Sequence, residues 1–306
     1  MKAIYLLIIP LLFLELAWGP AGFDPAIVEA VRLPRALGAV AAGAALAISG
    51  HLLQTALRNP LADPYLLGVS QTALFTALLS YVLWRLFSAP YLGYLAGSLI
   101  GAAAATAVLL YAARRAPLTV VVLFGVLLAF AASSATQLLL LALPPEELGY
   151  IYLSLQGSFA AYPPGPVGYA AAAAVAAIYA AAWAKARHIA AYIHGEEAAK
   201  GLGVDVEKTN LLIAAAGAAA AGVATATVGP VGFIGLLAPH MAKWAEKSGR
   251  FDKTLHAAAA MGVALALAAD NAIRLLLPRD VPATVVLSVV GAPAAAWLLL
   301  KYVRGL

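Results

Sequence analysis

The 306-residue sequence is 64% hydrophobic and only 11% charged, and its mean hydropathy is +0.91. A soluble domain of this length has no core large enough to bury so much apolar surface, so the composition predicts an all-α integral membrane protein. The net charge of +5 comes from basic residues scattered in loops between apolar segments, which favours a role in topology over nucleic-acid binding. The absence of cysteine excludes disulfides and thiol chemistry.

Apolar segments long enough to cross a bilayer recur along the whole chain. We expect about ten transmembrane helices, at 3–19, 36–57, 66–87, 92–112, 118–142, 166–185, 209–228, 232–247, 254–277 and 282–303. With the N-terminus inside, 14 of the 19 Lys and Arg residues fall on the inner side; the five on the outer side are Arg32, Arg35, Arg85, Arg274 and Arg279. This asymmetry predicts that both termini are cytoplasmic.

The first apolar segment also resembles a signal peptide, because Lys2 precedes the apolar run from Ala3 to Ala17. The following residues, Leu16-Ala17-Trp18-Gly19, form a poor cleavage site. We therefore expect the first helix to be retained.

The stretch from Arg32 to Ser70 combines a spanning segment with a polar break. It begins with RLPR, continues through small residues that include Gly38, Gly43 and Gly50, and ends in RNPLADP. Glycines on a membrane helix allow close helix packing. Non-helical backbone beside a span survives only next to protein or a water-filled cavity, so this break predicts a hinge or gate.

Several of these pieces resemble the FecCD-type permeases, which are the BtuC-like membrane subunits of ABC importers for iron chelates, haem and cobalamin. The matching pieces are RLPR at 32–35, GAALAISG at 43–50, RNPLADPYLLGVS at 58–70 and GEEAAKGLGV at 195–204. The resemblance implies the BtuC-like fold, with residues 1–306 forming a single transmembrane permease domain. It also implies three kinds of protein partner: a second copy of the chain, two ATP-binding cassette subunits and an extracytoplasmic substrate-binding protein.

The fifth segment, 118–142, carries four polar residues within five positions: Ser133, Ser134, Thr136 and Gln137. Such side chains hydrogen-bond within and between membrane helices, and they also line pathways. The sequence leaves both roles open. The resemblance further implies an inner gate, made by Asn59, Pro60 and Leu61 together with Pro117, Leu118 and Thr119.

Two hydrophilic segments interrupt the later spans. Residues 144–160 begin with two prolines and two glutamates, which predicts a short helix on the outer surface. The loop at about 186–208 predicts a helix over Glu196 to Lys200, ended by Gly201 and Gly203, and a second short helix from near Asp205. On composition alone this is a solvated loop; the resemblance implies that it couples to the ATPase, through Gly195, Glu196, Glu197, Ala198, Ala199, Lys200, Gly201, Leu202 and Gly203.

The remaining charged residues have local interpretations. Asp270 and Arg274 are four positions apart, which predicts an ion pair on one helix; the resemblance implies that Arg274 joins Arg32 and Arg35 in docking the binding protein. We expect Glu15 to reach the outer interface. His240 has no other ligand-type residue at metal-binding spacing and is predicted to be structural. Lys243 stands where the family has arginine, which removes a planar bidentate donor.

No GxxxxGK[ST] motif occurs, so we do not expect the chain to be an enzyme; ATP and Mg²⁺ would belong to the partner subunit. We expect no cofactor or metal on this chain. The predicted function is that of an importer permease in the cell membrane, carrying a ferric siderophore or cobalamin, with haem or an oxyanion such as molybdate as alternatives. A secondary transporter is the competing class, but the sequence shows neither an inverted repeat nor a central acid.

Overall fold

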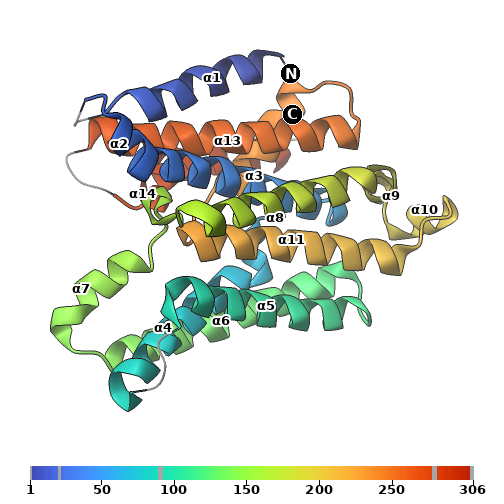
Figure 1. The fold of residues 1–306 in the computed structure, drawn as a ribbon. Coiled ribbons are helices and arrows are strands. Elements are labelled where there is room, and N and C mark those ends of the chain that lie inside the picture. Colours follow the sequence, from blue (N-terminus) through green and yellow to red (C-terminus); the bar gives the residue numbers. More distant parts are fainter. Residues whose placement is uncertain (1, 20–21, 89–91, 278–280, 304–306) are drawn as a thin grey trace.

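The computed structural model describes residues 2–19, 22–88, 92–277 and 281–303, and within these ranges the chain is helical with no strand. The long helices lie side by side in one bundle (Figure 1). Arg279 and Arg304 lie outside the described residues. The all-α prediction is confirmed for the part of the chain that the structure describes.

The helices occupy the positions that hydropathy predicts. In chain order they are α1 (Lys2–Ala17), α2 (Pro25–Ile27), η1 (Val28–Arg32), α3 (Leu33–Ala56), η2 (Pro64–Leu67), α4 (Val69–Phe87), α5 (Gly93–Ala113), α6 (Leu118–Leu141), α7 (Pro145–Ser154), η3 (Phe159–Ala161), α8 (Gly165–Ala184), α9 (Ala186–Ala190), η4 (Ala191–His194), α10 (Glu196–Gly201), α11 (Val206–Val228), α12 (Ile234–Ala245), α13 (Phe251–Leu276) and α14 (Ala283–Val303).

Six of the described helical stretches are long and apolar enough to cross a membrane. The α12 helix has only 12 residues, about 18 Å at 1.5 Å per residue, and is shorter than the hydrocarbon layer of roughly 30 Å. The number of crossings, predicted as about ten, therefore stays a prediction.

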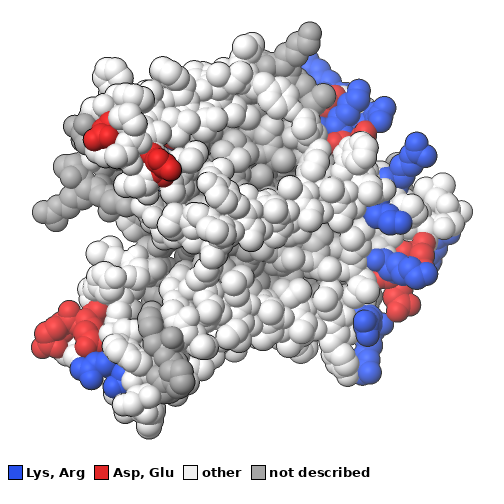
Figure 2. All heavy atoms as spheres, in the orientation of Figure 1, with Lys and Arg blue, Asp and Glu red and all other residues white. Residues whose placement is uncertain are grey.

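Lys and Arg gather at one end of the bundle, where α9 and α10 lie (Figure 2). We call this the basic end. The positive-inside rule assigns the basic end to the cytoplasm, and the orientation of the termini remains a prediction on that basis.

The α3 helix is the centre of the bundle. Its spanning stretch is 83% buried, whereas those of α6 and α8 are 28% and 17% buried. Gly43 faces Gly262 of α13, and Gly50 faces Gly235 of α12, so closely that a Cβ on any of the four would collide with backbone or proline atoms. The prediction that these α3 glycines permit close helix contact is confirmed.

The chain leaves the helix after α3, as the polar break predicts. Residues 57–63 form turns, η2 follows, and Gly68 adopts a left-handed conformation with φ of +69°. A Cβ on Gly68 would collide with the carbonyl of Gly125. This contact fixes the break against α6 rather than in solvent.

The loop at 186–208 begins with two short helices that were not predicted, α9 and η4, and it lacks one element that was predicted. The short helix α10 forms over Glu196–Gly201. No separate second helix follows, because Asp205 accepts a hydrogen bond from the Lys208 backbone N–H and caps the 23-residue α11. The capping role of Asp205 can be predicted from the sequence, but the helix that it caps continues into the seventh predicted span.

Candidate functional site

A hollow of about 530 Å³ lies between α6 and the break that follows α3. Three of the four polar residues of α6 line it: Ser133, Thr136 and Gln137. The adjacent Ser134 is exposed but does not line the hollow. Three of the four polar residues therefore face the hollow and Ser134 does not, a difference that the sequence alone does not predict.

The break contributes further polar groups to this hollow. Asp63 and Tyr65 line it, and Gln71 joins them from α4. Asp63 Oδ1 accepts a hydrogen bond of 2.9 Å from the Tyr65 backbone N–H. The Tyr65 hydroxyl and Gln71 Oε1 are buried and have no hydrogen-bond partner among the described residues.

No sequence motif distinguishes Tyr65 and Gln71 as candidate site residues. A buried polar atom without a partner costs free energy unless water or a ligand satisfies it. The two unpaired atoms therefore make this wall of the hollow polar. Thr136 has a structural partner as well, because its hydroxyl donates to the Ala132 carbonyl oxygen at 2.9 Å.

The six predicted gate residues lie in two segments, one in the break after α3 and one at the start of α6. Asn59 Oδ1 accepts a hydrogen bond of 2.9 Å from the Leu61 backbone N–H, which fixes the turn around Pro60. Pro117 precedes α6, where Leu118 is buried and Thr119 is exposed. Gly68, at the end of the break, lies against Gly125 of α6, the helix that begins at Leu118.

At the end opposite the basic end, Arg32, Arg35 and Arg274 come close together. Arg32 is buried, with 4% exposure, whereas Arg35 and Arg274 are partly buried, with side chains that are 11% and 10% exposed. Their role in docking a binding protein is not tested by this arrangement.

Two predictions about the acids beside these arginines are wrong. Asp270 pairs with Arg35 at 2.7 Å rather than with Arg274, and Arg274 lies 3.6 Å from Glu15. Glu15 is fully buried instead of reaching the interface. The reason is that α1 packs on α13, which turns Glu15 towards the arginines rather than outwards.

Arg32 acts as a backbone anchor. Its guanidinium donates to the carbonyl oxygens of Leu16, at 3.0 Å, and Gly22. Arg274 likewise donates to the Leu14 carbonyl oxygen at 2.9 Å. Both residues thus tie the end of α1 to the rest of the bundle.

The predicted coupling segment is a short helix with one buried face. Ala199 is fully buried against Ala191 and Tyr192, and the Tyr192 hydroxyl donates to Asn210 Oδ1 at 2.8 Å. The opposite face is exposed; it carries Glu197, Ala198, Lys200, Gly201, Leu202 and Gly203.

Ion pairs stabilise the exposed face of this segment. Lys200 Nζ lies 2.7 Å from Glu197 Oε1, and Lys208 Nζ lies 2.8 Å from Asp205 Oδ2. The hydrogen bond from Lys208 lowers the pKa of the Asp205 carboxyl. Gly195 begins the helix with φ of +99°, a conformation that side chains rarely adopt.

His240 contacts the backbone of its own helix, α12. Its Nδ1 lies 2.8 Å from the Leu236 carbonyl oxygen. Among the described residues no group of three His, Cys, Asp or Glu side chains is placed to hold a metal ion.

The chain matches known proteins along nearly its whole length. The model of the FecCD transport family matches residues 11–301. The ferric enterobactin transport system permease protein FepD of Escherichia coli is 33% identical over 291 residues, covering 92% of this chain and 84% of FepD. The hemin transport system permease protein HmuU of Yersinia pestis is 32% identical over 285 residues, covering 89% of this chain and 82% of HmuU.

A solved structure has the same fold. It is described as a metal-chelate type ABC transporter in an inward-facing conformation, and it aligns with a TM-score of 0.87 at 25% identity, covering 98% of both chains. With the family match over residues 11–301, the chain is a multi-pass membrane protein that belongs to the FecCD transport family.

Proposed function

We propose that this chain is the permease subunit of an ATP-driven importer and that the hollow beside α6 is part of its pathway for a metal chelate. The observation that carries this proposal is the convergence of Ser133, Thr136 and Gln137 with the polar break on one hollow. A membrane helix has little other reason to present these side chains beside non-helical backbone.

The pathway would be completed by a second copy of the chain. Around the hollow, α6 and α14 expose large apolar side chains, including Phe130, Leu138, Val289 and Val290 at 68–71% exposure. A homodimer would bury part of this surface and close the hollow on its open side.

Two ATP-hydrolysing subunits would bind at the basic end and move α10. The exposed Ala198 and Leu202 offer a small, partly apolar contact for a partner groove. A rigid-body motion of α10 would then shift the gate segments at Asn59–Leu61 and Pro117–Thr119. A substrate-binding protein would dock at the opposite end, near Arg32, Arg35 and Arg274.

The substrate class follows from the relatives. Their names give ferric enterobactin and hemin as cargoes, so we propose a metal chelate for this chain as well. A ferric siderophore or cobalamin is the first candidate and haem the second. Uptake by vesicles that contain the complete transporter, measured with each of these compounds, identifies the cargo.

A pair of neighbouring variants tests the pathway. Ser133→Trp places a large ring in the hollow, and Ser134→Trp places the same ring on an exposed position outside it. We expect Ser133→Trp to reduce ATP-dependent uptake at least tenfold and Ser134→Trp to leave it within about twofold, with both variants assembling normally with the ATPase. Equal uptake by the two variants would show that this hollow is not the pathway.

A further inference from the structure

A second hollow, of about 540 Å³, lies at the basic end of the bundle. It is formed by the end of α3, the end of α12 and the start of α13, and it shares no lining residue with the hollow beside α6. Its walls carry the side chains of Arg58, Lys243 and Lys247.

These three cations have no acidic partner. Among the described residues none of them lies within 4.0 Å of a carboxylate; Lys243 Nζ donates to Gln54 Oε1 at 3.4 Å. The acid that lines the hollow is Glu246, which accepts a hydrogen bond of 3.2 Å from the Ser248 backbone N–H. The described lining therefore has two more positive than negative side chains.

A buried polar side chain forms part of the same lining. His51 is 2% exposed, and its ring stacks on Phe251 with 4.7 Å between the centroids. Neither ring nitrogen makes a hydrogen bond to a described residue, although the Phe251 backbone lies close enough to interact with the ring. This buried imidazole therefore adds a polar ring to the wall of the hollow.

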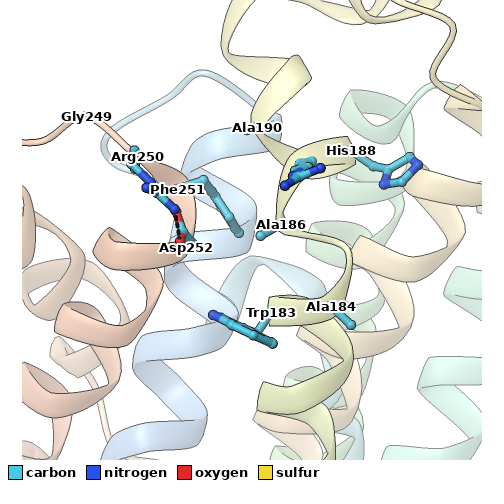
Figure 3. A pocket seen from close by; sticks show the side chains of 10 residues that line it. Trp183, Ala184, Ala186, His188, Ala190, Gly249, Arg250, Phe251 and Asp252 are labelled. Carbon is cyan, nitrogen blue, oxygen red and sulfur yellow. Dashed lines mark hydrogen bonds and ion pairs between the residues drawn. The ribbon is translucent and has the colours of Figure 1, made fainter.

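The adjacent hollow does not combine these features. It has a volume of about 800 Å³ and shares Gly249 and Phe251 with the hollow lined by Arg58, Lys243 and Lys247. Figure 3 shows Arg250 turned towards Asp252, and their ion pair of 2.7 Å neutralises that cation. This leaves Arg187 as the uncompensated cation among the described residues of that lining.

We propose that the hollow between Arg58, Lys243 and Lys247 binds a phosphate-bearing anion. Lysine and arginine that converge without acids favour phosphate, because its oxygens accept several charge-assisted hydrogen bonds at once. The volume exceeds that of a single phosphate ion and leaves room for the group that the phosphate esterifies. An anionic lipid headgroup and a soluble phosphate compound offer the same chemistry; basic pockets between helices at the cytoplasmic side commonly take headgroups.

The occupant would contact two segments of functional interest. Pro60 of the break and Ile193, next to α10, line this hollow. The Arg58 guanidinium lies 3.3 Å from the position of a Cβ on Gly195. The anion site itself does not depend on the proposed transport function, but its influence on the gate and the coupling segment does.

The test compares two sources of phosphate on the purified chain in detergent. One arm adds sodium pyrophosphate, with sodium chloride at equal ionic strength as its reference. The other arm adds phosphatidylglycerol, with phosphatidylcholine as its reference. The readouts are the apparent melting temperature and, for lipid, retention in native mass spectrometry. We expect one arm to raise the melting temperature by at least 3 °C, and that arm identifies the source.

Matched variants place the effect in this hollow. Lys243→Ala with Lys247→Ala should weaken the effective ligand about tenfold. Lys185→Ala with Arg187→Ala removes the same charge at the basic end, outside this hollow, and should leave binding unchanged. Lys247→Ala alone, on an exposed residue, replaces the first pair if that pair does not fold. Absence of stabilisation in both arms, or equal loss in the two pairs, would overturn the proposal, and neither result bears on transport.

Discussion

The Arg35 guanidinium and the Asp270 carboxylate form a bidentate pair that is shielded from solvent. Arg35 Nε and Nη2 lie 2.7–3.0 Å from the two carboxylate oxygens, and the side chains are 11% and 0% exposed. Both charged groups are largely shielded from water, so each relies on the other to offset its lost hydration. This residue-scale arrangement makes the pair more sensitive to losing one partner than to losing both.

Single and double substitutions of this pair should therefore differ. Arg35→Ala removes the bidentate partner of a buried carboxylate and should destabilise the chain by about 3–5 kcal/mol. Arg35→Met combined with Asp270→Leu should recover much of that loss, because apolar side chains of similar size fill the site without a charge. Chemical unfolding in detergent measures both. A double variant as unstable as the single one would show that the ion pair is not the source of the effect.

At the scale of elements, α10 presents two adjacent alanines to different surroundings. Ala199 is fully buried against Tyr192, whereas Ala198 is exposed. A substitution at both positions would mix damage to the chain's own packing with damage to a partner contact. The structure therefore requires that the two be tested one at a time.

Ala198→Trp should block binding of the ATP-hydrolysing subunit while leaving the permease as stable as the wild type. Ala199→Trp should overpack the contact with Tyr192 and cost about 1–3 kcal/mol. Co-purification with the ATPase and the melting temperature of the isolated permease separate the two effects. Normal ATPase binding and ATP-dependent uptake by Ala198→Trp would contradict a coupling role for α10.

For the whole molecule, the proposed homodimer makes a geometric prediction at the break. Leu61 is half-buried in the gate segment, and the chain contains no cysteine, so introduced thiols react without background. Leu61→Cys should crosslink to the same position of a second copy in at least one nucleotide state, because the gate would lie on the two-fold axis. Gel mobility after treatment with a short bifunctional reagent measures this.

A second position serves as the control for that experiment. Tyr169 is 57% exposed on α8, a helix that contacts α3 and α11 and contributes no residue to the hollow beside α6. Tyr169→Cys should not crosslink under the same conditions. Crosslinking at Tyr169 but not at Leu61 would place the dimer interface on another face.

Sequence patterns alone predict the helical class, the positions of the long helices, the break after α3 and the small-residue contacts of Gly43 and Gly50. Hydropathy and glycine content report these features because they arise from each segment's own transfer to an apolar environment and from its own backbone. The family motifs are likewise short and local. Together with hydropathy, these motifs predict the transporter class.

The side chains that meet across the bundle could not be predicted from the sequence. Arg35 pairs with Asp270 across 235 positions, and Asn271 contacts the Leu11 carbonyl across 260 positions. The separation of Ser133 from Ser134 and the convergence of Arg58, Lys243 and Lys247 on one hollow also depend on how helices rotate against one another. Those rotations are set by packing over the whole bundle, and a buried charge takes whichever partner that packing brings within reach.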